Sequence, residues 1–147
     1  MTAYPTKKQI LKRPRPKFPP GLLSVITFWK RFFYKNWNKE TVDNKFALLT
    51  TLAVLICDFY QKNPVEIIQG RPTRYIAKDN YIILTEPSII SLLHELAHHL
   101  FGKSELQACR WSVWLYQLRF RKDYQKLVWQ EHMLVKPPSK VGTKKLE

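Results

Sequence analysis

The chain has 147 residues, of which 45% are apolar and 14% aromatic, and this composition excludes an intrinsically disordered protein. Its formal net charge is +14, and its two cysteines are too few for a disulfide scaffold. The longest apolar stretch, residues 46–60, is too short and too polar to span a membrane, and residues 1–20 lack the apolar core of a signal peptide, so we expect a soluble, cytoplasmic protein.

Positive charge gathers at the two ends of the chain. Residues 1–20 hold six Lys or Arg and no acidic residue, and residues 136–147 hold four Lys and one Glu. We predict a basic, proline-rich arm at 1–21, a single domain at 22–135 with its core at 41–121, and a basic tail at 136–147. Five prolines argue against a helix or an inner strand in the arm. Basic ends of this kind usually only keep a protein in solution or attract anions weakly; the alternative is that they bind nucleic acid or an acidic protein partner.

Two amphipathic helices are predicted after the arm. Apolar residues recur at helical spacing from Leu22 to Phe33, with Lys, Arg, Ser and Thr between them. This cationic and aromatic helix is expected to pack on its own domain; the alternatives are a partner's groove or a membrane surface. The second helix is predicted from a cap at Thr41 or Asp43 to about Tyr60.

A small sheet is predicted next, from three short runs at residues 65–69, 73–77 and 81–85. The second and third runs flank Lys78-Asp79-Asn80, which has a suitable length for a hairpin connection. The third run directly precedes the next helix, and we expect it to form an edge of the sheet.

Three helices complete the predicted fold. The first begins after a cap at Thr85 or Ser88 and ends before Gly102. The other two are predicted at residues 104–121, which open with a capping-box sequence, and at 123–133. The predicted class is therefore α+β, predominantly helical, with a small three-stranded sheet packed against the helix that ends at Gly102.

An H-E-x-x-H motif, His94-Glu95-Leu96-Ala97-His98, lies inside that helix. Four residues turn an α-helix by about 400°, so the two histidines lie one turn apart on nearly the same face. Two imidazoles in this position can bind one Zn²⁺, and Glu95 stands beside them to accept a proton from an activated water.

A catalytic zinc takes three protein ligands and keeps one position for water. Glu105 is the predicted third ligand, because the chain reversal at Gly102 returns the next helix to the motif; its charge also suits a helix N-terminus. Cys109, one turn later, is a rival ligand or a buried packing residue. His99 points about 100° away from His98 and is predicted to support the site or to face solvent. His132 is isolated.

The chemistry expected of this set is peptide hydrolysis. Zinc lowers the pKa of its water to about 7, and Glu95 accepts the proton and passes it to the departing amine. A further group should stabilise the oxyanion, and the sequence leaves four candidates open: Tyr75, Tyr81, Tyr116 and Arg110.

The motif, followed by Gly102, Glu105 and Ala108 and preceded by Tyr81-Ile82-Ile83-Leu84, resembles the minimal gluzincin-type metallopeptidases. Examples are the ImmA/IrrE-like and SprT-like domains, many of them from bacteria and phages. The resemblance covers roughly residues 41–121.

This resemblance implies a mini-zincin fold in which His94, His98 and Glu105 bind Zn²⁺ and Glu95 is the general base. It also implies that an extended peptide substrate pairs with the edge strand, here Tyr81, Ile82, Ile83 and Leu84.

The predicted function is that of a zinc-dependent endopeptidase acting on a protein or peptide substrate, which the basic ends could place on nucleic acid. Two alternatives stay open. One is a structural or interaction component of a larger assembly, for example a phage particle, which would make the protein virion-associated. The other is a basic nucleic-acid-associated protein, although no recognised reader motif is present.

Overall fold

The structure is a computed structural model that describes residues 4–131 and 133–137. These residues form an α+β fold with a three-stranded and a two-stranded sheet. The helices are α1 (Lys7–Ile10), α2 (Pro20–Phe33), α3 (Val42–Phe59), α4 (Ile89–Phe101), α5 (Glu105–Arg119) and α6 (Arg121–Gln125). The strands are β1 (Glu66–Gln69), β2 (Arg74–Ile76), β3 (Tyr81–Leu84), β4 (Val128–Gln130) and β5 (Met133–Val135). None of the described helices is long and apolar enough to cross a membrane.

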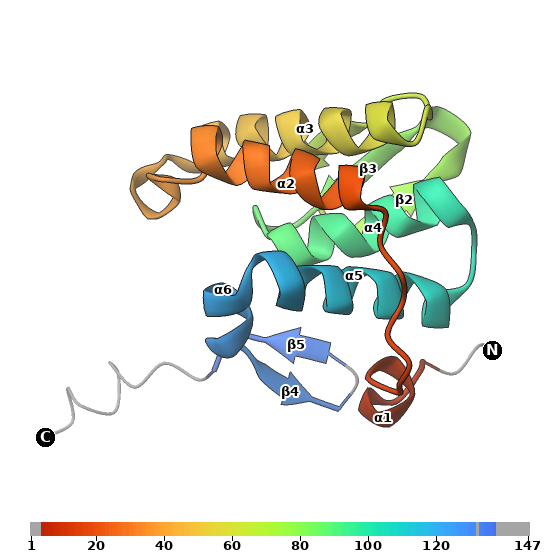
Figure 1. The fold of residues 1–147 in the computed structure, drawn as a ribbon. Coiled ribbons are helices and arrows are strands. Elements are labelled where there is room, and N and C mark those ends of the chain that lie inside the picture. The colour runs from red at the N-terminus through yellow and green to blue at the C-terminus, as the bar shows by residue number, and fades with distance from the viewer. Residues whose placement is uncertain (1–3, 132, 138–147) are drawn as a thin grey trace, which may run out of the picture.

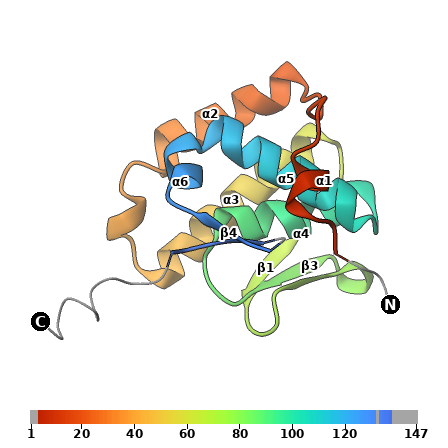
Figure 2. The same cartoon turned by 90° about the horizontal axis from the view of Figure 1, so that it is seen from below.

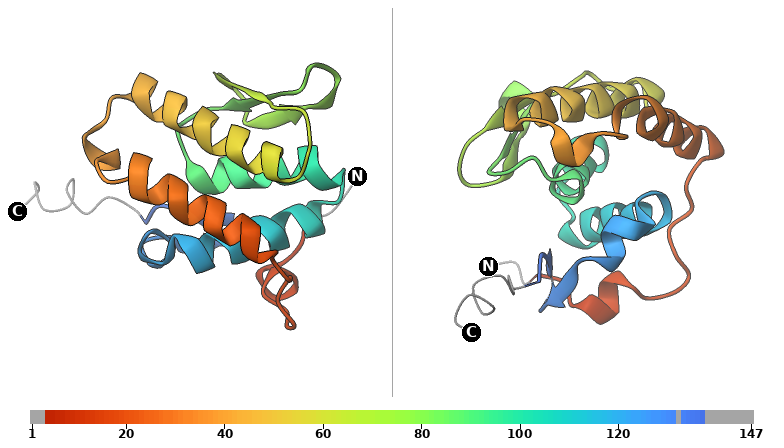
Figure 3. Two further views of the ribbon diagram at one scale, coloured as in Figure 1. Left: turned by 45° about the horizontal axis from the view of Figure 1, so that its top comes forward. Right: turned by 90° about the vertical axis from the view of Figure 1, so that its left-hand side faces the viewer.

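The helices stack in layers around one core. Figure 1 shows α2 and α3 side by side above α4 and α5, and Figure 3 shows α1 and the β4–β5 hairpin beyond α5. Each of the four long helices gives fully buried side chains to this core, among them Trp29, Leu52, Leu96 and Leu115. The apolar spacing of the four helices therefore determines the layer order.

Capping residues set the helix starts as predicted. The hydroxyls of Thr41, Ser88 and Ser104 accept hydrogen bonds from the backbone N–H groups of Asn44, Ser91 and Gln107 at 3.1, 3.2 and 3.1 Å. These caps begin α3, α4 and α5, so the helix boundaries inferred from Ser and Thr positions are confirmed.

One face of α2 differs from the prediction. Leu22, Ile26 and Trp29 are buried, but Phe32 is 61% exposed and contacts Phe28 with ring centroids 4.8 Å apart. The apolar pattern of this helix is therefore wider than the face that packs on α3.

The three-stranded sheet packs against α4, as predicted, but its strand order is β1-β3-β2. β3 pairs with β1 in parallel and with β2 in antiparallel orientation. The expectation that Tyr81, Ile82, Ile83 and Leu84 form an edge strand is therefore wrong, because both sides of β3 are already paired. The edges of the sheet are β1 and β2.

Two further predictions are corrected by the structure. The arm is not wholly extended, because Thr6 and Gln9 form a capping box that begins α1, and Ile10 at its end is fully buried. Residues 123–133 are not one helix: α6 ends at Gln125, and β4 and β5 follow as an antiparallel pair. Figure 2 shows α1 lying across α5. The C-terminal tail from residue 138 onward and His132 lie outside the described residues.

Candidate metal centre

The turn between α4 and α5 brings three predicted ligands together. One oxygen of the Glu105 carboxylate lies 3.2 Å from His94 Nε2, and the other lies 2.8 Å from His98 Nε2. Glu105 is the first residue of α5, so the reversal after Gly102 places its side chain over the last turns of α4. The structure therefore brings His94, His98 and Glu105 to one place.

Gly102 ends α4 and also orients a histidine. Its φ of +108° lies in a region that residues with a Cβ rarely adopt, and no atom lies within 4 Å of where a Cβ would be. Its carbonyl oxygen lies 2.9 Å from His98 Nδ1. When Nδ1–H donates to this carbonyl, the lone pair of His98 Nε2 faces Glu105 and is free to bind a metal.

The donor set fits a zinc ion. Zinc–nitrogen and zinc–oxygen bonds of about 2.0–2.2 Å place neighbouring ligand atoms of a tetrahedral site about 3.3–3.6 Å apart. The 3.2 Å distance from one Glu105 oxygen to His94 Nε2 is close to this spacing, whereas the 2.8 Å distance from the other oxygen to His98 Nε2 is at least about half an ångström shorter. Two imidazoles with one carboxylate are a donor set that zinc favours, and the three side chains would have to move apart to admit an ion.

Cys109 lies on the other side of His94. The ligand atoms of His94, Glu105 and Cys109 all lie within 4.8 Å of one another, which makes Cys109 an alternative donor. Its Sγ, however, is 3.8 Å from His94 Nδ1, whereas Glu105 contacts His94 Nε2. Burial raises the pKa of this thiol to about 12. Cys109 thus contacts His94 through Nδ1, whereas Glu105 contacts the Nε2 atoms of both histidines.

The site is accessible but partly desolvated. The side chains of His94, His98 and Glu105 are 23, 13 and 28% exposed. Burial lowers the pKa of His94, an effect that the nearby Glu105 carboxylate partly offsets. The neutral imidazole, which is the form that binds a metal, is therefore favoured at neutral pH.

Glu95 lies next to His94 on α4, and its side chain is partly buried. Burial raises its pKa to about 7, with a further increase from Glu105, whereas His98 and a hydrogen bond from the Tyr75 backbone lower it. A bound cation would add a further lowering. The proton affinity of the Glu95 carboxylate therefore suits a group that both accepts and releases a proton near neutral pH.

The neighbouring His99 connects the sheet to α4. Its Nδ1 lies 2.8 Å from the Tyr75 hydroxyl of β2, and its Nε2 lies 2.7 Å from the Asn63 carbonyl oxygen. An Nε2–H that donates to Asn63 leaves Nδ1 to accept from Tyr75. His99 thus links α4 to β2 and to the segment before β1.

Three of the four candidates for oxyanion stabilisation, Tyr75, Arg110 and Tyr116, contact other parts of the protein. The Tyr75 hydroxyl bonds to His99, and the Arg110 guanidinium bonds to backbone carbonyls of the arm. Tyr116 stacks on Phe120 within an aromatic cluster, and Tyr81 lies on the central strand of the sheet.

Sequence reasoning missed two supporting contacts, the Gly102 carbonyl on His98 and the Tyr75 backbone on Glu95. Both are backbone groups, so no residue type could have marked them. Comparisons of the chain with protein-family models, with curated proteins and with solved structures found no match. The likeness to gluzincin-type metallopeptidases therefore stays a prediction from the motif.

Proposed function

We propose that this protein is a zinc-dependent peptidase that hydrolyses peptide bonds with Glu95 as the general base. The observation that carries the proposal is the contact of one carboxylate, Glu105, with the Nε2 atoms of both motif histidines. Glu95 lies on the same helix between these histidines. Two neutral nitrogens, one carboxylate and an adjacent base are the groups that zinc-assisted hydrolysis requires.

Each side chain has a defined task in this proposal. Zinc held by His94, His98 and Glu105 would acidify water and polarise the scissile carbonyl. Glu95 accepts the proton of the attacking water and delivers it to the departing amine. The backbone of Tyr75 favours the charged form of Glu95 by lowering its pKa, and the Gly102 carbonyl orients the ring of His98.

The proposed substrate strand is β2, in place of β3. β2 is an edge of the sheet, and its residue Tyr75 contacts Glu95 through the backbone. An extended peptide that adds to this edge would pair with the backbone groups of β2 that Glu95 does not engage, and would run past the proposed base.

Replacement of Glu95 by Gln tests the proposal. Glu95→Gln should retain the metal content of the wild-type protein and lose at least a hundredfold in hydrolysis of a quenched fluorescent peptide library, because the amide cannot accept the proton. Glu86→Gln, an exposed glutamate before α4, is the matched control and should hydrolyse the library like the wild type. Unchanged hydrolysis by Glu95→Gln, or no hydrolysis by the zinc-loaded wild type, would contradict the proposal.

The alternative of a role in a larger assembly stays a prediction. Basic ends suit docking on a partner of that kind. The described part of the N-terminal arm, however, is held by contacts within this chain.

A further inference from the structure

The N-terminal arm is fastened to α5 by one arginine. Arg110 donates from Nη1 to the carbonyl oxygens of Gln9, Ile10 and Lys12 at 3.1, 2.9 and 2.7 Å, and from Nη2 to that of Pro14 at 2.7 Å. The Trp114 indole donates to Ile10 at 3.0 Å. A guanidinium that satisfies four backbone carbonyls fixes the course of the chain that supplies them.

The fastened chain carries alternating cations. Residues 13–17, which we name the basic strap, read Arg13-Pro14-Arg15-Pro16-Lys17, and the side chains of Arg13, Arg15 and Lys17 are all exposed. Arg13 and Pro14 lie in a bend, and from Arg15 to Lys17, in a chain that is extended, two residues span about 6–7 Å. The prolines stiffen this spacing because they restrict the backbone.

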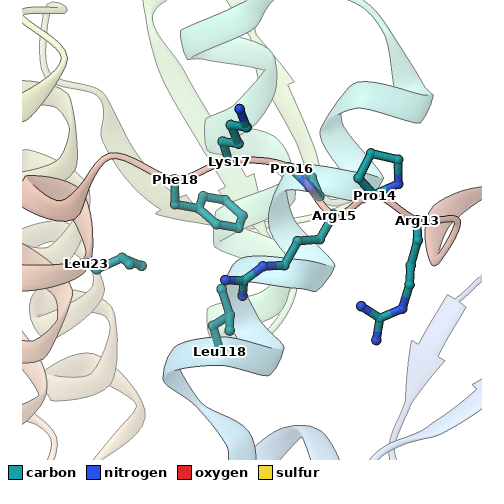
Figure 4. Close-up of a pocket in the computed structure, with 8 residues that line it drawn as sticks. All are labelled: Arg13, Pro14, Arg15, Pro16, Lys17, Phe18, Leu23 and Leu118. Carbon is teal, nitrogen blue, oxygen red and sulfur yellow. The ribbon is translucent and has the colours of Figure 1, made fainter.

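A hollow of about 860 Å³ lies along the basic strap, within the size range of ligand sites. Its walls combine the three cations with apolar surface from Pro14, Pro16, Phe18, Leu23 and Leu118, and none of these lining residues is acidic. Figure 4 shows Arg13 and Arg15 extending toward the α5 side of the strap, with the Phe18 ring beside them and Lys17 on the opposite side.

The positive charge of this surface is not neutralised within the protein. Among residues 4–131 and 133–137, no Lys or Arg nitrogen lies within 4.0 Å of a carboxylate oxygen; the two ion pairs there are those of Glu105 with His94 and His98. Arg13 lies over the Trp114 ring at 5.8 Å, whereas no described contact engages the charges of Arg15 and Lys17, and the field of the strap would steer an external polyanion toward the hollow.

We propose that the basic strap and the hollow beside it bind single-stranded nucleic acid. Phosphates of the strand would contact Arg13, Arg15 and Lys17, and unstacked bases would lie on the prolines and Phe18. A duplex presents the same phosphates but keeps its bases stacked inside, so the apolar walls favour a single strand. This inference is independent of the metal centre, which lies at the other end of α5.

Fluorescence anisotropy of the full-length protein with a labelled 20-residue oligo-dT tests the proposal. The double variant Arg15→Glu/Lys17→Glu should bind at least tenfold more weakly than the wild type. It should also lower the slope of log affinity against log salt by about 1.4, the value for two phosphate contacts to a single strand. Lys35→Glu/Lys39→Glu, which changes the charge equally between α2 and α3, is the matched control and should weaken binding less than threefold.

Several outcomes would overturn the proposal. One is equal weakening by the two double variants, which would show attraction by net charge alone. Another is wild-type binding that does not respond to salt, or no binding. Preference for a duplex of the same length, or for phosphatidylserine vesicles over the oligonucleotide, would also overturn it. Thermal unfolding of each variant checks that the strap changes leave the fold intact.

Discussion

At the scale of single residues, the candidate metal centre depends on how each imidazole is held at its second nitrogen. His98 Nδ1 faces the Gly102 carbonyl, and His94 Nδ1 faces the Cys109 sulfur. In both imidazoles the Nε2 atom therefore faces the carboxylate of Glu105. The sequence predicted the three ligands from their types and spacing, but these supporting atoms come from a backbone group and from a cysteine that equally suited a ligand role.

Replacement of Cys109 by Ala separates these two roles. If the thiol only supports His94, Cys109→Ala should still bind one equivalent of zinc with an affinity about tenfold lower, because loss of a ligand's hydrogen-bond partner costs about 10–100-fold. Isothermal titration with Zn²⁺ measures this. Loss of stoichiometric binding in Cys109→Ala would show instead that the sulfur is a ligand. Cys57→Ala, at the other buried cysteine, is the matched control.

A buried tyrosine predicts how stability depends on pH. Burial and the 2.8 Å hydrogen bond to Asp123 raise the pKa of Tyr34 above its ordinary value near 10. Above pH 10 the unfolded chain therefore loses this proton while the folded protein retains it, so the free energy of unfolding should fall as the pH rises from 10 to 12.

Urea unfolding of Tyr34→Phe tests this dependence. The variant should be about 1–2 kcal/mol less stable than the wild type at pH 8, because it lacks the bond to Asp123. It should also show a shallower loss of stability above pH 10. A decline as steep as that of the wild type would mean that other groups cause it.

At the scale of elements, the sequence predicted helices better than strand order. The caps at Thr41, Ser88 and Ser104 fix where three helices begin, and Gly102 fixes where α4 ends. These are local signals. Whether β3 is central or at an edge depends on its parallel pairing with β1, across the intervening β2, which caps and turns do not specify. The uninterrupted apolar run of β3, against the charged Arg74 in β2, is the signal that could have indicated it.

The hairpin of β4 and β5 was missed for a related reason. Strands of three residues are too short for period-two alternation to be distinguished from a helical pattern. Glu131 adopts a φ of +57° at the turn, which a glutamate rarely does and which the residue type therefore did not announce. The helix of the arm and its packing on α5 were not predicted. α1 is only one turn long, and the main partners of the arm, Arg110 and Trp114, lie about a hundred residues away in the sequence.

Release of the arm from α5 is the prediction at this scale. Arg110→Ala should free the arm and lower the stability of the protein by about 2–4 kcal/mol, because several hydrogen bonds from a charged donor are lost. Limited trypsin digestion should then cleave after Lys12 and Lys17 much faster than in the wild type. Arg74→Ala, at an exposed arginine of β2, is the control. An arm that resists trypsin equally in Arg110→Ala would show that Ile10 and Trp114 suffice to hold it.

At the scale of the whole molecule, α5 connects the two proposed sites. Its first residue, Glu105, contacts the motif histidines, and Arg110 and Trp114 in its middle fasten the arm. Leu118 near its end lines the hollow beside the basic strap. Ile10 of the arm packs with Cys109, and Cys109 in turn contacts His94.

The most direct test of the proposed metal centre is elemental analysis of the purified protein together with Glu105→Ala, and with Glu131→Ala as the control at an exposed glutamate. We expect one equivalent of zinc in the wild type and the control. In Glu105→Ala we expect less than one equivalent of zinc, because loss of a ligand should lower the affinity by more than the roughly 10–100-fold that removal of a supporting contact causes. A wild-type protein without stoichiometric metal, or a Glu105→Ala variant that binds zinc as tightly as the wild type, would contradict the account.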